Sequence, residues 1–225
     1  MGNPSTFGRF ITFEGGEGSG KSTQIQRLAI RLGQHPAMSG VDVVMTREPG
    51  GAPLSEQIRT LLVTGHPEGM DPKTELMLVM AARTEHVQKR LYPTLRRGGW
   101  VLCDRFADST LAYQGYGRGM NRDHLTLFNR WATSGLTPDL TILLDIDPEI
   151  GLSRTEPRQE MNSQNSASED RFERVGDTFH QQVNAGFRQL AKAEPKRFFQ
   201  VDANQEADTL EALIWERVCG AFPNL

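Results

Sequence analysis

A glycine-rich stretch near the start of the chain has the residue types and the spacing that phosphate binding needs. In residues 10–23, FITFEGGEGSGKST, Gly15 is followed by four residues and then by Gly20, Lys21 and Ser22, which completes a phosphate-loop pattern. Glycines let the backbone turn tightly and aim N–H groups inward, Lys21 can reach the β- and γ-phosphates, and the Ser22 hydroxyl can ligate Mg²⁺. The pattern predicts a nucleoside triphosphate site made of Gly15, Gly16, Glu17, Gly18, Ser19, Gly20, Lys21, Ser22 and Thr23.

The residues on either side of this loop favour the same interpretation. Residues 10–13 have the pattern of a short buried strand, and residues 23–32 that of a helix, whose positive end would face the bound phosphates. The alternative, a glycine-rich turn that matches by chance, would not need a strand before it and a helix after it.

The composition is that of an ordinary globular protein. The 225 residues are 37% hydrophobic and 24% charged, with a formal net charge of −3, so no overall basic field attracts nucleic acid. We expect one domain over residues 1–225, with a small lid at about 154–171. Cys103 and Cys219 lie far apart and indicate neither a disulfide framework nor a metal site. Neither a membrane span nor a signal peptide is recognisable, so we expect a cytoplasmic protein without membrane partners.

Strand-like and helix-like segments alternate along the chain. We expect strands at 10–13, 41–46, 99–104, 140–145 and 197–201, and helices at 23–32, 55–62, 72–95, 124–133, 148–155, 171–192 and 207–218. Glu75 falls in the first turn of the 72–95 helix, where an anion is favoured. The alternation predicts an α/β fold in which a five-stranded parallel sheet carries helices on both faces. Ligands bind such sheets at the carboxyl ends of the strands.

Charged residues fall at those strand ends. Asp104 closes the third strand, where a phosphate-loop protein holds Mg²⁺, although an acidic residue there could simply be solvated. Four segments contribute arginines near the same rim, which indicates a second anionic ligand: Arg47, Arg59, Arg83 and Arg105. Three more flank the polar segment 156–170 and could neutralise a phosphoryl group in transfer, or could be ordinary surface charges: Arg154, Arg158 and Arg171.

Taken together, these motifs resemble the thymidylate kinase family. The resemblance rests on the phosphate loop with Glu17 inside it, on TREPGG at 46–51, on AAR at 81–83 and on DRFADSTLAYQG at 104–115. It runs from Phe10 to about Gly119 and continues through residues 138–139 and 144–148. It implies the phosphate-loop fold of nucleoside monophosphate kinases, a homodimer, and the transfer of a phosphoryl group from ATP to dTMP with Mg²⁺, the two nucleotides being the small-molecule partners.

The resemblance also implies roles for individual residues. Glu17 lies near the acceptor's 3′-hydroxyl, Arg47 and Arg59 lie near its phosphate, and Arg105 grips that phosphate. Arg83, Thr110 and Gln114 match residues that read the thymine base, and Tyr113 matches the tyrosine under the sugar. The catalytic set is then Lys21 and Arg105 with a lid arginine, Arg154 or Arg158, because Gly18 stands where another branch of the family places its catalytic arginine. The metal ligands are Ser22 and Asp104.

The chain departs from the family pattern in two places. Val79 occupies the position where the family usually places a phenylalanine that stacks on thymine, so a stacking contribution of roughly 1 kcal/mol is lost there. The Asn/Ser-rich insert at 162–168 is longer than the family pattern, which leaves the choice between Arg154 and Arg158 open.

Two other functions compete with this interpretation. A kinase acting on another nucleotide or on a nucleoside would use the same phosphate loop, but an unphosphorylated acceptor would not need so many rim arginines. A GTP-binding switch protein would commonly carry an Asn-Lys-x-Asp sequence after a strand, whereas here the fourth strand ends in LDIDP at 144–148.

Overall fold

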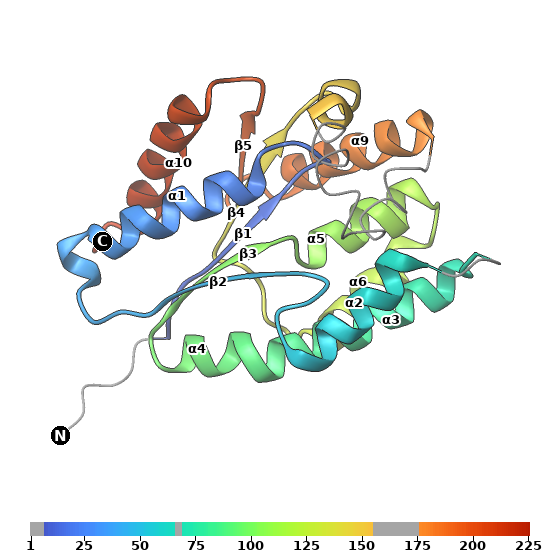
Figure 1. Ribbon diagram of the computed structural model, residues 1–225, viewed down its shortest axis with the longest axis horizontal. Coiled ribbons are helices and arrows are strands. Elements are labelled where there is room, and N and C mark those ends of the chain that lie inside the picture. The colour runs from blue at the N-terminus through green and yellow to red at the C-terminus, as the bar shows by residue number, and fades with distance from the viewer. Residues whose placement is uncertain (1–6, 66–68, 155–175) are drawn as a thin grey trace, which may run out of the picture.

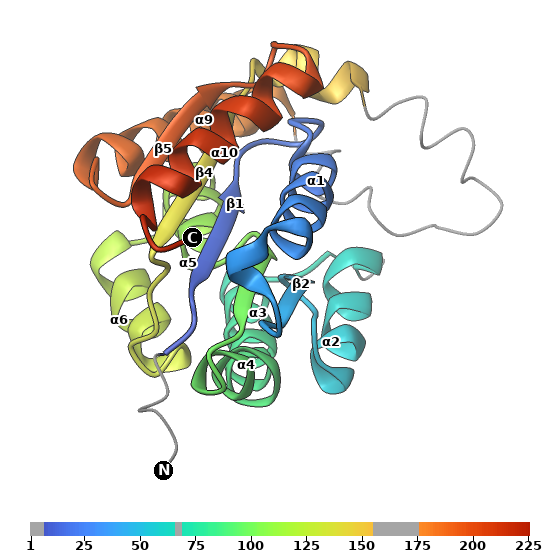
Figure 2. The same cartoon turned by 90° about the vertical axis from the view of Figure 1, so that its left-hand side faces the viewer.

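The computed structural model describes residues 7–65, 69–154 and 176–225. Its centre is one parallel sheet in the order β2-β3-β1-β4-β5. The strands are β1 (Phe10–Glu14), β2 (Val43–Arg47), β3 (Trp100–Asp104), β4 (Leu140–Asp145) and β5 (Phe198–Asp202). This confirms the predicted sheet, with strand boundaries within two residues of those expected. Figure 2 shows the strands running through the middle of the molecule with helices around them.

Helices cover both faces of the sheet (Figure 1). On one face, α1 (Lys21–Gln34) and α10 (Ala207–Ala221) bury their apolar sides against β1, β4 and β5. The opposite face carries α4 (Tyr92–Arg96) and α9 (Asp177–Ala193), and α3 (Pro72–His86) precedes α4 on that side. Two further helices pack beyond this layer, α2 (Pro53–Thr64) against α3 and α6 (Arg122–Ala132) against α3 as well. A short 3₁₀ turn, η1 (Pro36–Met38), follows α1.

The predicted helix over 72–95 is helical along that range but not uniform. A π-helical segment, η2 (Val87–Leu91), joins α3 to α4. The start of α3 follows from its sequence, because the Asp71 side chain accepts hydrogen bonds from the backbone N–H groups of Lys73 and Thr74, and Pro72 occupies the first turn.

One helical segment was not predicted. It consists of α5 (Ala107–Thr110) and the π-helical η3 (Leu111–Gly117), and it packs against α9 and α6. The helix predicted over 148–155 is observed at 148–154, whereas the predicted lid and the beginning of the helix predicted over 171–192 lie outside the described residues. Among the residues described, none of the helices has the length and apolarity required to span a bilayer.

Candidate active site

The phosphate loop connects the carboxyl end of β1 to α1, as the motif predicts. Gly15, Gly18 and Gly20 all have positive φ angles, of 135°, 65° and 87°, which side chains disfavour. A Cβ atom on Gly18 would also lie 1.9 Å from the carbonyl oxygen of Gly151. The loop therefore depends on glycine both for its backbone path and for its contact with the helix at 148–154.

Lys21 lies inside the loop. Its ammonium group donates hydrogen bonds to the carbonyl oxygens of Gly16, at 2.8 Å, and Gly15, at 3.2 Å, and the Ser19 hydroxyl donates to Gly16 at 2.9 Å. Burial, and after it the positive charge of Arg105, lower the pKa of Lys21. The phosphate loop thus holds the Lys21 ammonium group within its own turn.

The two predicted metal ligands are in contact. The Ser22 hydroxyl donates to a carboxylate oxygen of Asp104 at 3.2 Å. Asp104 reaches this position because it is the last residue of β3, directly beside Phe13 of β1. Hydroxyl and carboxylate oxygens are ligands that Mg²⁺ prefers, so the pair fits that ion, with bound phosphates and water completing the coordination.

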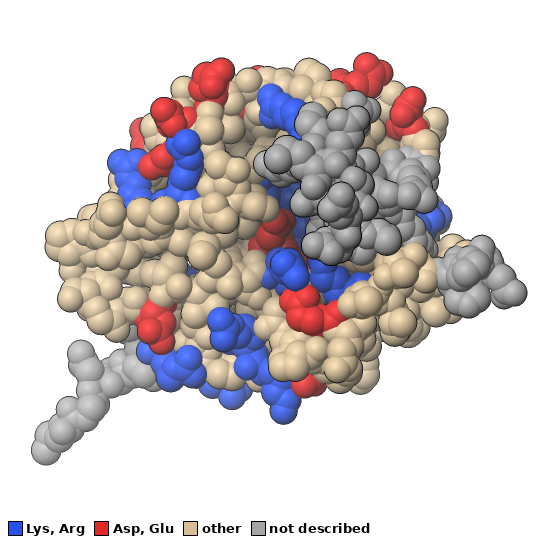
Figure 3. Space-filling model, viewed as in Figure 1, with Lys and Arg blue, Asp and Glu red and all other residues tan. Residues whose placement is uncertain are grey.

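A second cluster lies beside the loop and consists of Glu17, Arg105 and Tyr113. Glu17 accepts a hydrogen bond from Arg105 Nη2 at 2.6 Å and from the Tyr113 hydroxyl at 2.9 Å. Arg105 Nη1 also donates to the Gly15 carbonyl oxygen at 2.9 Å, which ties the cluster to the phosphate loop. Burial alone would raise the pKa of Glu17, but the charges of Arg105 and Lys21 lower it to about 2. Figure 3 shows acidic and basic side chains close together in the middle of the face viewed.

A buried carboxyl group, Glu14, lies next to this cluster and interacts with the charge of Arg105. It accepts hydrogen bonds from the Phe106 backbone N–H at 2.8 Å and from the Ser109 hydroxyl at 2.6 Å, so it caps the start of α5. Burial, and next the nearby carboxylate of Asp108, raise the pKa of Glu14 to about 8. Arg105 just before this cap has a left-handed backbone, with φ of 66°.

Arg83 is surrounded by protein groups. Only 2% of it is exposed, and its Nε donates to Glu48 at 2.7 Å. Its Nη1 donates to Thr110 Oγ1 and Asn129 Oδ1, and its Nη2 donates to the Phe106 carbonyl oxygen. Four of the five N–H groups of this guanidinium are therefore used to join α3 to α5, α6 and the loop after β2, which leaves one for a ligand.

The other two predicted rim arginines lie at the loop after β2. Arg47 pairs with Glu56 at 3.0 Å and is about half exposed, and Arg59 Nη1 donates to the Pro49 carbonyl oxygen at 2.9 Å. Glu56 also accepts from the Gly51 backbone N–H at 2.8 Å, so α2 fixes this loop from its far side.

Two helices face each other where base readers were predicted. Along α3 the inward positions are four residues apart, and the same spacing recurs along α5 and η3. The facing residues are Glu75, Val79 and Arg83 on α3, and Thr110, Gln114 and Arg118 on α5 and just beyond η3. Polar contacts join the two rows at both ends, Arg83 to Thr110 and Glu75 to Gln114, and Val79 stands between them on its helix.

Comparison with known proteins decides the family. A family model described as thymidylate kinase matches residues 13–214. A thymidylate kinase from Magnetococcus marinus is 50% identical over 215 residues, which make up 96% of this chain and 97% of that one. The chain belongs to the thymidylate kinase family. Enzymes of this family are ATP-dependent nucleoside monophosphate kinases that phosphorylate dTMP to dTDP.

Other comparisons agree with this family. A thymidylate kinase from Alkalilimnicola ehrlichii is 44% identical over 216 residues, 96% of this chain and 94% of that one. The crystal structure of thymidylate kinase from Ehrlichia chaffeensis has a TM-score of 0.72 to this structure at 32% identity, and the match covers 94% of this chain and 98% of that one. The fold of a thymidylate kinase is therefore present over nearly the whole length.

Of the two predicted catalytic lid arginines, the structure describes one. Arg154 lies at the end of the helical residues 148–154, three residues beyond the glycine that touches the phosphate loop, and its Nη1 donates to the Ala203 carbonyl oxygen at 3.1 Å. Arg158 lies outside the described residues, as does Arg171.

Two buried groups that support the thymidylate kinase site were not predicted. Asn184 of α9 donates to the Ile146 carbonyl oxygen and stands against Gly16 of the phosphate loop, leaving no room for a Cβ there. Asp108 accepts two hydrogen bonds from Arg197, at 2.6 and 2.9 Å. The sequence showed Asn184 as a polar residue beside the apolar positions of α9, but it did not indicate which residues Asn184 would contact.

Proposed function

We propose that this chain catalyses the family reaction at the phosphate loop and the adjoining Glu17–Arg105–Tyr113 cluster. The observation that carries the proposal is the hydrogen bond from Arg105 Nη1 to the Gly15 carbonyl oxygen. This bond fixes the guanidinium that would bind the acceptor phosphate against the loop that would hold ATP. Two anionic substrates can then be held next to each other, which is what phosphoryl transfer between nucleotides requires.

In the proposed reaction, an oxygen of the dTMP phosphate bonds to the γ-phosphorus of ATP. The bond from that phosphorus to the β–γ bridging oxygen breaks, and dTDP and ADP result. The second pKa of a phosphate monoester is near 6, so the acceptor is largely a dianion at neutral pH and needs no protein base. Positioning and charge neutralisation then carry the catalysis.

Each predicted residue takes a proposed role on this basis. Lys21 and the loop N–H groups hold the β- and γ-phosphates, and Arg105 holds the acceptor phosphate, with Arg47 and Arg59 near that phosphate. The thymine base lies beside Val79 and is read by Arg83, Thr110 and Gln114. Glu17 accepts from the acceptor's 3′-hydroxyl, and Tyr113 lies under the sugar. Arg154 or Arg158 supplies the further positive charge. Support comes from the distances above for Lys21, Arg105, Glu17 and Tyr113.

We propose Mg²⁺ as the metal and Ser22 with Asp104 as the groups that hold it. Their mutual hydrogen bond places a hydroxyl and a carboxylate at the mouth of the loop. A bound Mg²⁺ would neutralise part of the charge on the phosphates. The hydrogen bond between Ser22 and Asp104 holds the end of the phosphate loop next to the carboxyl end of β3.

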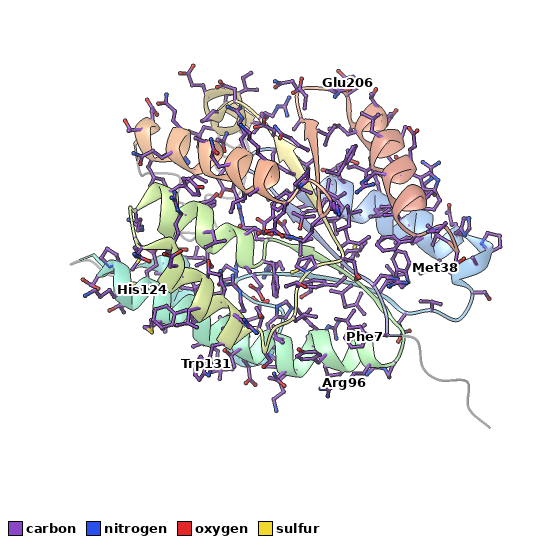
Figure 4. All side chains as sticks on the ribbon, turned by 180° about the vertical axis from the view of Figure 1, so that it is seen from behind. Phe7, Met38, Arg96, His124, Trp131 and Glu206 are labelled. Carbon is purple, nitrogen blue, oxygen red and sulfur yellow. The ribbon has the colours of Figure 1, made fainter. Side chains whose placement is uncertain are left out.

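We also propose a homodimer formed through α3 and α6. These helices pack against each other and expose large apolar side chains outward, including Trp131 at 79% and Leu127 at 64% exposure, with Phe128 and Met77 nearby on the same pair of helices. Figure 4 shows Trp131 at the periphery of the molecule. A second copy would bury this surface. Because its substrates are nucleotides of the cell interior, we propose a cytoplasmic enzyme.

A coupled assay of ADP release tests the proposed function. ATP and Mg²⁺ are supplied with dTMP, dUMP, dCMP, dGMP, dAMP or thymidine in turn, and chelation of the metal is the control for its role. Turnover selective for dTMP that stops on chelation is expected. Turnover with thymidine but not dTMP would refute the phosphate-acceptor role of Arg105.

A further inference from the structure

The Glu75 carboxylate is buried against the helix that follows β3. Its exposed fraction is 0%. Oε1 accepts hydrogen bonds from Gln114 Nε2 at 2.8 Å and from Arg118 Nε at 2.9 Å, and Oε2 accepts from Arg118 Nη2 at 2.9 Å. The carboxylate is therefore held in place by a bidentate arginine, and one oxygen is directed at the Gln114 amide.

This contact decides which way the Gln114 amide faces. A carboxylate oxygen can only accept, and of the two ends of an amide only the nitrogen donates. Turned over, the amide would set its carbonyl oxygen against the oxygen of Glu75, and a donor would be lost from a buried carboxylate. The orientation with Nε2 toward Glu75 thus follows from the chemistry of the pair.

The other end of the amide is an acceptor with no protein partner in the described part of the chain. Among the described residues, no hydrogen bond is donated to Gln114 Oε1, and this atom is not one of the fully buried side-chain atoms that lack a partner, which are Gln24 Oε1 and His35 Nδ1. Gln114 follows Thr110 by four residues on the segment that faces Val79 and Arg83. Its carbonyl oxygen is thus available at the place where the acceptor base is proposed to bind.

We propose that Glu75 is a positioning residue that sets base specificity by fixing the Gln114 amide with its carbonyl oxygen toward the acceptor base. This inference rests on the proposed function. A pyrimidine with an N3–H group, such as thymine or uracil, donates to that oxygen. Cytosine presents a lone pair at N3 and is rejected, because two acceptors would face each other in a buried site.

The test compares kcat and KM for dTMP, dCMP and N3-methyl-dTMP in the wild-type enzyme and in Glu75→Met. Without the carboxylate, the Gln114 amide can turn and offer Nε2 to cytosine N3. We expect the preference for dTMP over dCMP, and over N3-methyl-dTMP, to fall at least tenfold, mainly through KM. The kcat for dTMP should stay within about threefold.

Two control variants separate this role from a merely structural one. Glu75→Gln keeps an oxygen facing Gln114, because that position accepts from both Gln114 and Arg118, so it should keep the dTMP preference. Glu85→Met removes a carboxylate from α3 outside this contact and should also keep it. Equal losses for all three nucleotides in Glu75→Met would overturn the inference.

A charge exchange covers the case in which Glu75→Met fails to fold. Gln114→Glu alone sets two carboxylates against each other and should lose dTMP turnover. Adding Glu75→Gln lets the new amide turn its nitrogen toward the carboxylate at position 114, at the cost of the hydrogen bond from Arg118 Nε. The double variant should therefore recover both turnover and the preference for dTMP relative to Gln114→Glu alone. A double variant no better than the single one would overturn the inference. A wild-type enzyme that does not use dTMP refutes the proposed function before any variant is compared, and this inference with it.

Discussion

The buried carboxyl group of Glu14 makes the stability of this enzyme depend on pH. Its pKa is raised to about 8 in the folded protein, from an ordinary value of 4.5, first by burial and then by Asp108. Between these two values the folded chain keeps a proton that the unfolded chain releases. The stabilisation is complete below pH 4.5 and is lost as the pH rises toward 8.

The size of the effect follows from that interval. One pH unit inside it is worth about 1.4 kcal/mol, so the free energy of unfolding should fall by about 3 kcal/mol between pH 5.5 and 7.5 because of this group. In a chain of this length the change corresponds to roughly 5–10 °C in the melting temperature. Glu14→Gln keeps the size of the side chain and its bond with the Phe106 N–H but has no proton to lose.

Urea unfolding at 25 °C and constant ionic strength measures the effect at both pH values. Other titrating groups contribute to both proteins, so the difference between wild type and Glu14→Gln isolates Glu14. We expect the variant to gain about 3 kcal/mol relative to wild type on going from pH 5.5 to 7.5. Glu216→Gln, at an exposed position of α10, is the control and should follow the wild type. Parallel pH profiles of wild type and Glu14→Gln would refute the reasoning.

Three other predictions test separate parts of the structure. Glu48→Gln breaks a fully buried ion pair with Arg83 and should lower the free energy of unfolding in urea by about 3–5 kcal/mol. The control is Glu56→Gln, at the half-exposed pair with Arg47, which should lower it by under about 1 kcal/mol. Equal losses of stability in the two variants would contradict the buried network. Val79→Phe adds an aromatic face between the two polar contacts of α3 and should lower KM for dTMP about fivefold, worth about 1 kcal/mol, and an unchanged KM would place the base elsewhere. Trp131→Glu should turn the proposed dimer into a monomer in analytical ultracentrifugation, while an unchanged mass would exclude α6 from the interface.

Features encoded by neighbouring residues could be predicted from the sequence. The phosphate loop is a contiguous motif, and the buried strands are short apolar runs, so both were found with nearly correct boundaries. Asp104 was placed correctly because the carboxyl ends of parallel strands share one edge, and its contact with Ser22 follows. The strand order, by contrast, depends on pairings between distant segments.

The helix at 107–117 shows why other features could not be predicted. Ser109, Gly115 and Gly117 have weak helix propensity, and local pattern alone gave no reason for a helix there. Contacts with distant residues stabilise it instead. Glu14 caps its start from β1, and Gly117 lies so close to Phe179 of α9 that a Cβ atom would be 2.5 Å from the ring. The segment that carries three predicted substrate residues is thus specified by tertiary packing.

Glu75 illustrates the same limit at the level of one side chain. Its place in the first turn of α3 explains a carboxylate through the helix dipole, and the sequence suggested nothing more. In the fold, Gln114 and Arg118 come to it from 39 and 43 residues away and convert that carboxylate into a fixed acceptor. The base-facing end of Gln114 is then determined by a residue that need not touch the substrate. The proposed base specificity therefore depends on the contact between α3 and the helical segment at 107–117. A sequence motif that includes Gln114 but not Glu75 leaves out the residue that orients the amide.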